Sequence, residues 1–116
     1  MSFVKCIDVV SMIIGEATAR FAPLWKLDVE SNRILEQYCS VIDSLAEEFG
    51  GEALEVSVDE ISMDITITME CEDMIIDSTA HKFCTLTSQA KAISFSASKS
   101  GGLNVNFLFP GVWVRT

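Results

Sequence analysis

The chain has 116 residues, 49% of them hydrophobic, and seventeen Asp and Glu outnumber eight Lys and Arg to give a net charge of -9. This length and apolar content suffice for one domain with its own core, and we expect a single domain over residues 1–116. The negative charge repels phosphate backbones and anionic headgroups, so we expect neither nucleic acid nor a membrane as a partner. No run of eighteen apolar residues is present, which excludes a typical spanning helix.

The N-terminal stretch and the cysteines indicate an intracellular protein. Lys5 precedes an apolar run, and Ala17-Thr18-Ala19 has the spacing that signal peptidase reads, but Asp8 interrupts the run. Widely spaced cysteines without a CxxC pair are typical of reduced thiols. The cysteines are Cys6, Cys39, Cys71 and Cys84. We therefore predict a cytoplasmic protein without disulfides.

Two helices are predicted in the first half of the chain. Apolar residues recur at helical spacing from Phe3 to Phe21, and the opposite side of this segment is also unusually apolar. Pro23 cannot continue the helix, so a loop through Leu24-Trp25 is expected. Asp28 is suited to the N-cap of a second helix, which runs to Phe49 before Gly50-Gly51 stops it.

After these glycines the apolar period changes from helical spacing to alternation, which predicts strands. A first alternating set covers residues 54–58, and a second set of shifted phase runs from Ile61 to Cys71, so we expect a hairpin turn at Asp59-Glu60. A third helix is predicted from Asp77 or Ser78 to about Lys91. Alternation over 93–97 and 103–109, on either side of Gly101-Gly102, predicts a second hairpin.

The element order ααββαββ predicts an α+β two-layer sandwich. In this fold an antiparallel sheet of about four strands, made of two hairpins, packs against two or three helices. The second sheet face is expected to point toward water. The residues expected on it are Ser62, Asp64, Thr66, Thr68, Ser94, Ser96, Asn104 and Asn106.

A metal site is one functional hypothesis, resting on the acidic cluster from Glu70 to Asp77. Carboxylate oxygens suit Mg²⁺ or Ca²⁺, and the single histidine lies three residues before a cysteine, on one face of the predicted third helix. The candidate ligands are Glu70, Glu72, Asp73, His81 and Cys84. A small metal-dependent enzyme or binder would use this cluster; a solvated acidic edge is the alternative. No phosphate loop, nucleophile elbow or zinc-protease motif is present, so we expect no catalytic residue and no cofactor.

The preferred functional hypothesis is a non-catalytic interaction or regulatory module that self-associates as a homodimer or binds a protein partner. It rests on an excess of apolar side chains for so small a domain, because exposed apolar patches usually mark interfaces. The predicted interface residues are Val9, Ile13, Leu108 and Trp113. The alternative is that the first helix is simply enclosed between the second helix and the sheet.

The order helix, two strands, helix and final hairpin ending in Phe107-Leu108-Phe109-Pro110 resembles the terminal part of histidine-kinase-type ATPase domains, including anti-sigma-factor kinases. The resemblance implies a degenerate nucleotide-binding domain. Where that family carries a metal-binding Asn, the Ser40 to Phe49 stretch offers only Asp43, and Glu70 to Met74 lacks the glycines of the nucleotide-binding box. No site residue is therefore carried over from the family.

Overall fold

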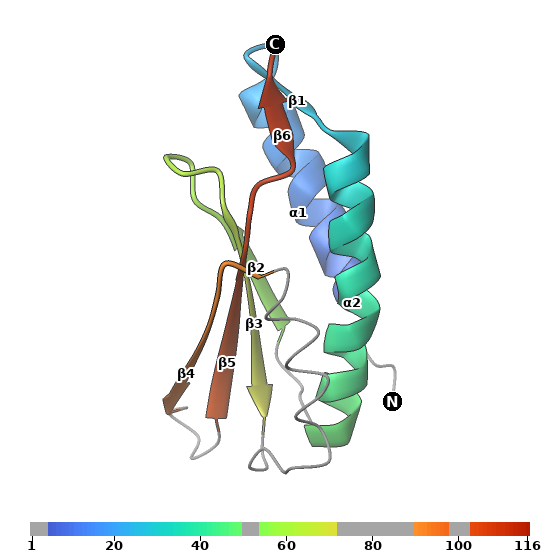
Figure 1. The fold of residues 1–116 in the computed structure, drawn as a ribbon, viewed down its shortest axis with the longest axis vertical. Coiled ribbons are helices and arrows are strands. Elements are labelled where there is room, and N and C mark those ends of the chain that lie inside the picture. Colours follow the sequence, from blue (N-terminus) through green and yellow to red (C-terminus); the bar gives the residue numbers. More distant parts are fainter. Residues whose placement is uncertain (1–4, 50–53, 72–89, 98–102) are drawn as a thin grey trace.

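The computed structural model describes residues 5–49, 54–71, 90–97 and 103–116. These residues form an α+β fold with two helices and two antiparallel sheets, as Figure 1 shows. The elements are α1 (Cys6–Phe21), β1 (Trp25–Leu27), α2 (Val29–Phe49), β2 (Leu54–Val58), β3 (Ile65–Cys71), β4 (Ala92–Ala97), β5 (Leu103–Phe109) and β6 (Trp113–Arg115). The predicted α+β class and both helices of the first half are confirmed. The third helix, predicted to end at about Lys91, falls almost entirely outside the described residues; its predicted last residues, Ala90 and Lys91, form a bend before β4 and are not helical.

The larger sheet has the strand order β2-β3-β5-β4, and all of its neighbouring strands are antiparallel. Both predicted hairpins are therefore confirmed, because β2 pairs with β3 and β4 pairs with β5. α1 and α2 lie together on one side of this sheet (Figure 1). β2 and β4 are its edge strands, and α1 contacts β2.

A second, two-stranded sheet corrects the prediction of a single sheet of about four strands. The predicted loop at Leu24-Trp25 leads into β1, which pairs antiparallel with β6 so that Trp25 lies opposite Arg115 and Leu27 opposite Trp113. Just beyond β1, the Asp28 N–H donates to the Val112 carbonyl at 2.7 Å. The described residues thus contain six strands, and the link between the two helices is fixed by the segment that follows β5.

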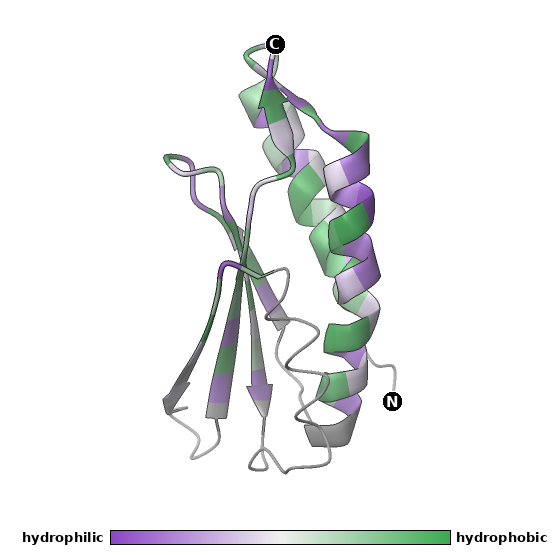
Figure 2. Cartoon of the chain, viewed as in Figure 1, coloured by the Kyte–Doolittle hydropathy of each residue, from purple (hydrophilic) through white to green (hydrophobic). Residues whose placement is uncertain are grey.

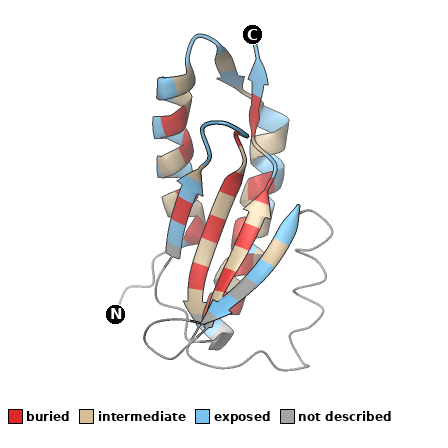
Figure 3. Cartoon of the chain, turned by 90° about the vertical axis from the view of Figure 1, so that its left-hand side faces the viewer, coloured by how far each residue is buried: buried red, intermediate tan, exposed pale blue. Residues whose placement is uncertain are grey.

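The core lies between the helices and the inner face of the larger sheet. Its helical part includes Cys6, Val10 and Ala17 of α1, which recur at the spacing of one helix face and are fully buried. Along β3 and β5, buried residues alternate with half-buried ones (Figure 3), which are polar except for Leu108, and the apolar residues form the matching pattern in Figure 2. The outer face is polar as predicted, and on it Thr68 Oγ1 donates to Asn106 Oδ1 at 2.7 Å.

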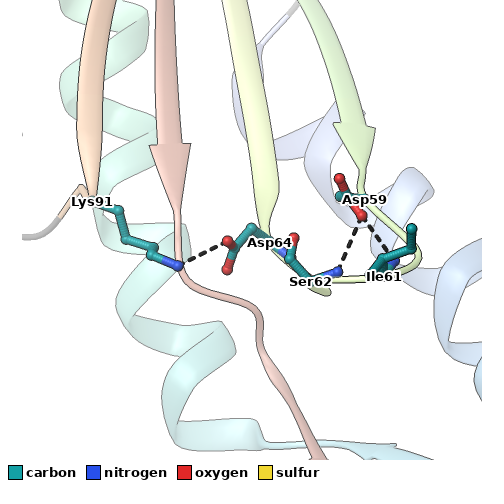
Figure 4. A network of polar contacts seen from close by, with 5 residues as sticks. All are labelled: Asp59, Ile61, Ser62, Asp64 and Lys91. Carbon is teal, nitrogen blue, oxygen red and sulfur yellow. Dashed lines mark hydrogen bonds and ion pairs between the residues drawn. The ribbon is translucent and has the colours of Figure 1, made fainter.

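The turn between β2 and β3 corrects the predicted strand start at Ile61. The Asp59 carboxylate accepts backbone hydrogen bonds from Ile61 at 2.8 Å and Ser62 at 3.1 Å (Figure 4), which stabilises a turn and not an extended strand. β3 therefore begins at Ile65, and Ser62 and Asp64, expected on the strand, belong to the connection. Ile61 is left 96% exposed at the tip.

The start of α2 confirms Asp28 as the residue that precedes the helix. Its carbonyl accepts the first helical hydrogen bond from the Asn32 N–H at 3.0 Å. Its carboxylate accepts a hydrogen bond from the Ser31 hydroxyl and not from a backbone amide. Asp28 therefore makes hydrogen bonds in two directions: its N–H donates to Val112, and its carbonyl and carboxylate accept from the first turn of α2.

Candidate interaction surface

A groove lies between α1 and the edge strand β2, and we call it the α1–β2 groove. It has a volume of about 530 Å³. Its lining residues are Ile13, Glu16, Ala19 and Arg20 of α1 and Val56, Ser57 and Val58 of β2. The groove exists because α1 packs over the outermost strand, where no further strand continues the sheet among the described residues.

The side of α1 next to this groove is apolar along most of its length. Val9, Met12, Ile13 and Glu16 are three or four residues apart and therefore share one helix face, which we call the α1 face. Val9 and Ile13 are half-buried and pack against the core, whereas Met12 is 57% exposed. The fully buried residues of α1 form a separate stripe, so the α1 face adds partly exposed apolar surface, of which Met12 is the most exposed part.

The outer edge of β2 carries unpaired backbone groups among the described residues. β2 pairs with β3 on one side only, and Figure 3 shows it at one edge of the sheet. Its sequence Leu-Glu-Val-Ser-Val contains no proline or lysine, the residues that usually keep edge strands from pairing. An open strand edge beside an apolar helix face is suited to the addition of another strand.

Charged side chains lie at the end of the groove toward the β2–β3 turn. Arg20 makes an ion pair with Glu60 at 2.9 Å, with both side chains more than half exposed. Such an exposed pair contributes at most about 1 kcal/mol. Glu16 has no ion-pair partner among the residues that the structure describes. One acidic and one basic group therefore border the groove, and neither is buried.

The four predicted interface residues are not gathered on one surface. Val9 and Ile13 lie on the α1 face, and Ile13 lines the groove. Leu108 alternates with the buried residues of β5 and so points to the opposite face of the sheet. Trp113 is only 7% exposed, with its ring edge-to-face against Phe21 at 5.2 Å. Self-association through these residues stays a prediction.

Trp113 also bonds to α1. Its indole Nε1–H donates to Thr18 Oγ1 at 2.8 Å, and the Thr18 hydroxyl in turn donates to the Ile14 carbonyl. The Trp113 side chain, which we interpreted from the sequence as part of an interface, is therefore buried within the chain's own fold. Two features of the groove have no signal in the sequence, the exposure of Met12 and the position of β2 at an edge, because both depend on how distant segments pack.

Most of the candidate metal ligands lie outside the described residues. This applies to Glu72, Asp73, His81 and Cys84, and to the rest of the acidic cluster up to Asp77. Glu70 is described: it lies on β3 opposite Asn104 and is half-buried. Within the described part of the chain, no three acidic, histidine or cysteine side chains gather closely enough to hold a metal ion. The metal hypothesis stays a prediction.

Asp43, the residue that the ATPase resemblance singled out, has a structural partner. Its Oδ1 accepts a hydrogen bond from the backbone N–H of Cys6 at 2.7 Å. Burial raises the pKa of the Asp43 carboxyl, while this hydrogen bond opposes the shift. The carboxylate thus serves the N-terminus of α1.

Cys6 and Cys39 are fully buried free thiols on α1 and α2. A hydrogen bond to Cys39, together with burial, raises the pKa of the Cys6 thiol. Because the thiolate is the reactive form, a raised pKa and the absence of exposure make Cys6 a poor nucleophile. The two cysteines therefore act as small apolar core residues.

Comparison with known proteins gives no assignment: no family model, no curated protein and no solved structure matches this chain. Within the described residues, neither helix has the length and apolarity needed to cross a membrane. Any function must therefore be inferred from the surfaces described above.

Proposed function

We propose that the chain is a non-catalytic interaction module that self-associates through the outer edge of β2 and the α1 face. The observation that carries this proposal is the outer edge of β2, which pairs with no other described strand and lies beside the partly exposed apolar side of α1. Strand addition would satisfy the open backbone groups of the edge, and the helix face would supply apolar contact area. The partner that we propose is a second copy of the chain.

The sequence of β2 suits pairing with itself. In an antiparallel pair centred on Val56, Leu54 lies opposite Val58 of the second copy and Glu55 lies opposite Ser57. No like charges face each other directly in this register, and all five residues of the strand are paired. A two-fold axis through Val56 produces this arrangement, and such an axis relates the subunits of most homodimers.

The α1 face is required in addition to the strand. A stable interface usually buries about 800 Å² on each partner, more than a five-residue strand offers alone. Because α1 lies over β2, a two-fold axis at Val56 brings the two α1 helices near each other on the same side of the joined sheet. Met12 and Ile13 then become buried against the second copy.

The proposal is tested by measuring the mass of the protein in solution by sedimentation velocity over a wide concentration range. We expect a dimer for the wild type and a monomer for Ser57→Lys, which places a charge on the strand edge, and for Met12→Glu. Val29→Glu is the matched control, because Val29 is 74% exposed on α2, away from the groove. Each variant is first checked for native circular dichroism. A wild type that stays monomeric at the highest concentration would falsify the proposal.

We also propose that the rest of the chain completes a two-layer sandwich, with a third helix between β3 and β4 that begins at Asp77 or Ser78 and ends before Ala90, and that the protein acts in the cytoplasm. The placement of α1 and α2 on one side of the sheet supports the layered arrangement. NMR of residues 77–89 tests the third helix: helical chemical shifts and slowly exchanging amides are expected, and uniformly fast amide exchange would contradict it.

A further inference from the structure

A separate hollow lies between the first half of α2 and the segment that joins β5 to β6, and we call it the α2 pocket. Its volume is about 180 Å³. Its lining residues are Ser31, Ile34, Leu35, Tyr38, Phe109, Pro110, Gly111 and Val112. None of these residues belongs to the α1–β2 groove, so the pocket is independent of the proposed self-association.

The walls of the α2 pocket are fixed by contacts outside it. The Tyr38 and Phe109 rings stack at 6.2 Å and join α2 to β5. The Val112 carbonyl accepts the Asp28 N–H at 2.7 Å. A Cβ on Gly111 would lie 2.3 Å from the Met63 carbonyl oxygen, so the backbone here sits directly against the β2–β3 turn. A pocket with walls held in this way is preformed, as small-molecule sites usually are.

The chemistry of the lining excludes charged ligands, anions above all. Six of the eight lining side chains are apolar or aromatic, Gly111 contributes only backbone, and no cationic residue is among them. The Asp28 carboxylate, bonded to the Ser31 hydroxyl, stands next to the start of α2 and would repel an anion. Neither the Tyr38 hydroxyl nor the Gly111 N–H has a hydrogen-bond partner among the described residues. Two polar groups of the lining are therefore open to a ligand, and only the Tyr38 hydroxyl belongs to a side chain.

We infer that the α2 pocket binds a small uncharged aromatic compound of about one ring that carries a hydroxyl group. A dry apolar cavity of about 150 Å³ is known to hold benzene, so this volume fits one ring with a small substituent. It is below the roughly 300 Å³ that drug-sized ligands need. The ring packs among Ile34, Leu35 and Phe109, and the ligand hydroxyl pairs with the Tyr38 hydroxyl.

The test is a titration of the ¹⁵N-labelled protein with phenol, with toluene as the analogue that lacks the hydroxyl. We expect saturable shifts of the Gly111 and Val112 amide signals, with phenol binding more tightly than toluene. Ile34 is 39% exposed at the rim of the pocket, so Ile34→Trp should fill the pocket and weaken phenol binding about tenfold or more. Val29→Trp, the same change at an exposed position of α2, is the control and should bind phenol as the wild type does.

Tyr38→Phe separates the hydroxyl contact from the shape of the pocket. This variant keeps the ring that stacks on Phe109, so it should still bind toluene while losing the preference for phenol. A preference for phenol that survives in Tyr38→Phe overturns the assigned hydroxyl contact. Absence of saturable shifts in the wild type, or equal phenol affinity in Ile34→Trp, overturns the site.

Discussion

The Asp43 carboxylate of α2 accepts the backbone N–H of Cys6 at the start of α1, at 2.7 Å. α1 has no capping side chain of its own, since Lys5 makes no such bond. The first turn of one helix is therefore capped by the other, which fixes the position of α1 along α2. The buried Cys39, one turn before Asp43, lies against Cys6 at the same place.

Two substitutions of Asp43 should distinguish the effect of its hydrogen-bond acceptor on stability from the effect of its negative charge. Asp43→Ala removes the acceptor and should lower the free energy of unfolding by about 1 kcal/mol. Asp43→Asn keeps an oxygen acceptor and has no ionisation cost, so at neutral pH it should be at least as stable as the wild type. Urea denaturation of both variants is the measurement. Equal losses in Asn and Ala variants would show that the charge, and not the acceptor, matters.

The pH dependence of the same pair follows from the raised pKa of Asp43. The folded protein holds this proton more tightly than the unfolded chain, so ionisation of Asp43 reduces stability as the pH rises from the ordinary pKa of 3.8 through the raised value. Asp43→Asn lacks this contribution. Its stability relative to the wild type should increase over that range and then level off; a constant difference would contradict the assignment.

Two glycine substitutions should have opposite effects. Gly111→Ala places a Cβ 2.3 Å from the Met63 carbonyl oxygen and should destabilise the protein by about 1–3 kcal/mol. Gly15 lies within α1, and a Cβ there meets nothing within 4 Å, so Gly15→Ala should stabilise by about 0.5–1 kcal/mol. The melting temperatures of the two variants and of the wild type, measured by thermal unfolding, test both expectations. A neutral Gly111→Ala would mean that the backbone contact with Met63 relaxes freely.

The β2–β3 turn should respond to the loss of the Asp59 carboxylate. Its hydrogen bonds from Ser62 and Ile61 lower the pKa of Asp59, so it stabilises the fold above its ordinary pKa and loses that effect as the pH falls through the lowered value. Asp59→Ala should lower the melting temperature at neutral pH and less so in acid. Asp59→Asn, which keeps an acceptor, is the control; the ion pair of Lys91 with Asp64 in Figure 4 is left intact in both.

Salt should strengthen the proposed dimer. Each copy carries a net charge of -9, and the interface offers few ion pairs, so repulsion between copies opposes association. Raising the ionic strength from about 0.05 M to about 0.5 M shortens the screening length and should lower the dissociation constant. Sedimentation equilibrium at several salt concentrations measures it. A dissociation constant that rises with salt would indicate attraction between opposite charges and would contradict the apolar interface.

Much of the fold could be predicted from the periodicity of apolar residues. The features that were predicted wrongly depend on local hydrogen bonds or on contacts between distant segments, which periodicity does not report. α1, α2, β2 and the hairpin of β4 and β5 each have several turns or alternations of pattern. Ile61 continues an apolar alternation in the sequence, but the hydrogen bonds of Asp59 place it in a turn. β1 and β6 have three residues each, too few to show a period, and they form because they pair with each other.

The candidate site was predictable only in part for the same reason. Val9 and Ile13 stand out in the sequence as apolar residues on the second face of an amphipathic helix. Trp113 also stands out, but its burial against Phe21 depends on a contact between distant segments. The α1–β2 groove requires β2 to be an edge strand, and strand order is a property of the whole sheet.

The hydrogen bond of the Trp113 indole to Thr18 spans 95 residues of sequence. During synthesis the N-terminal helix leaves the ribosome long before this partner exists, so its final contacts close late. Folds dominated by such distant contacts form slowly, and their early intermediates expose apolar surface. The nascent chain therefore leaves the Trp113 side of α1 uncovered until residue 113 has been synthesised.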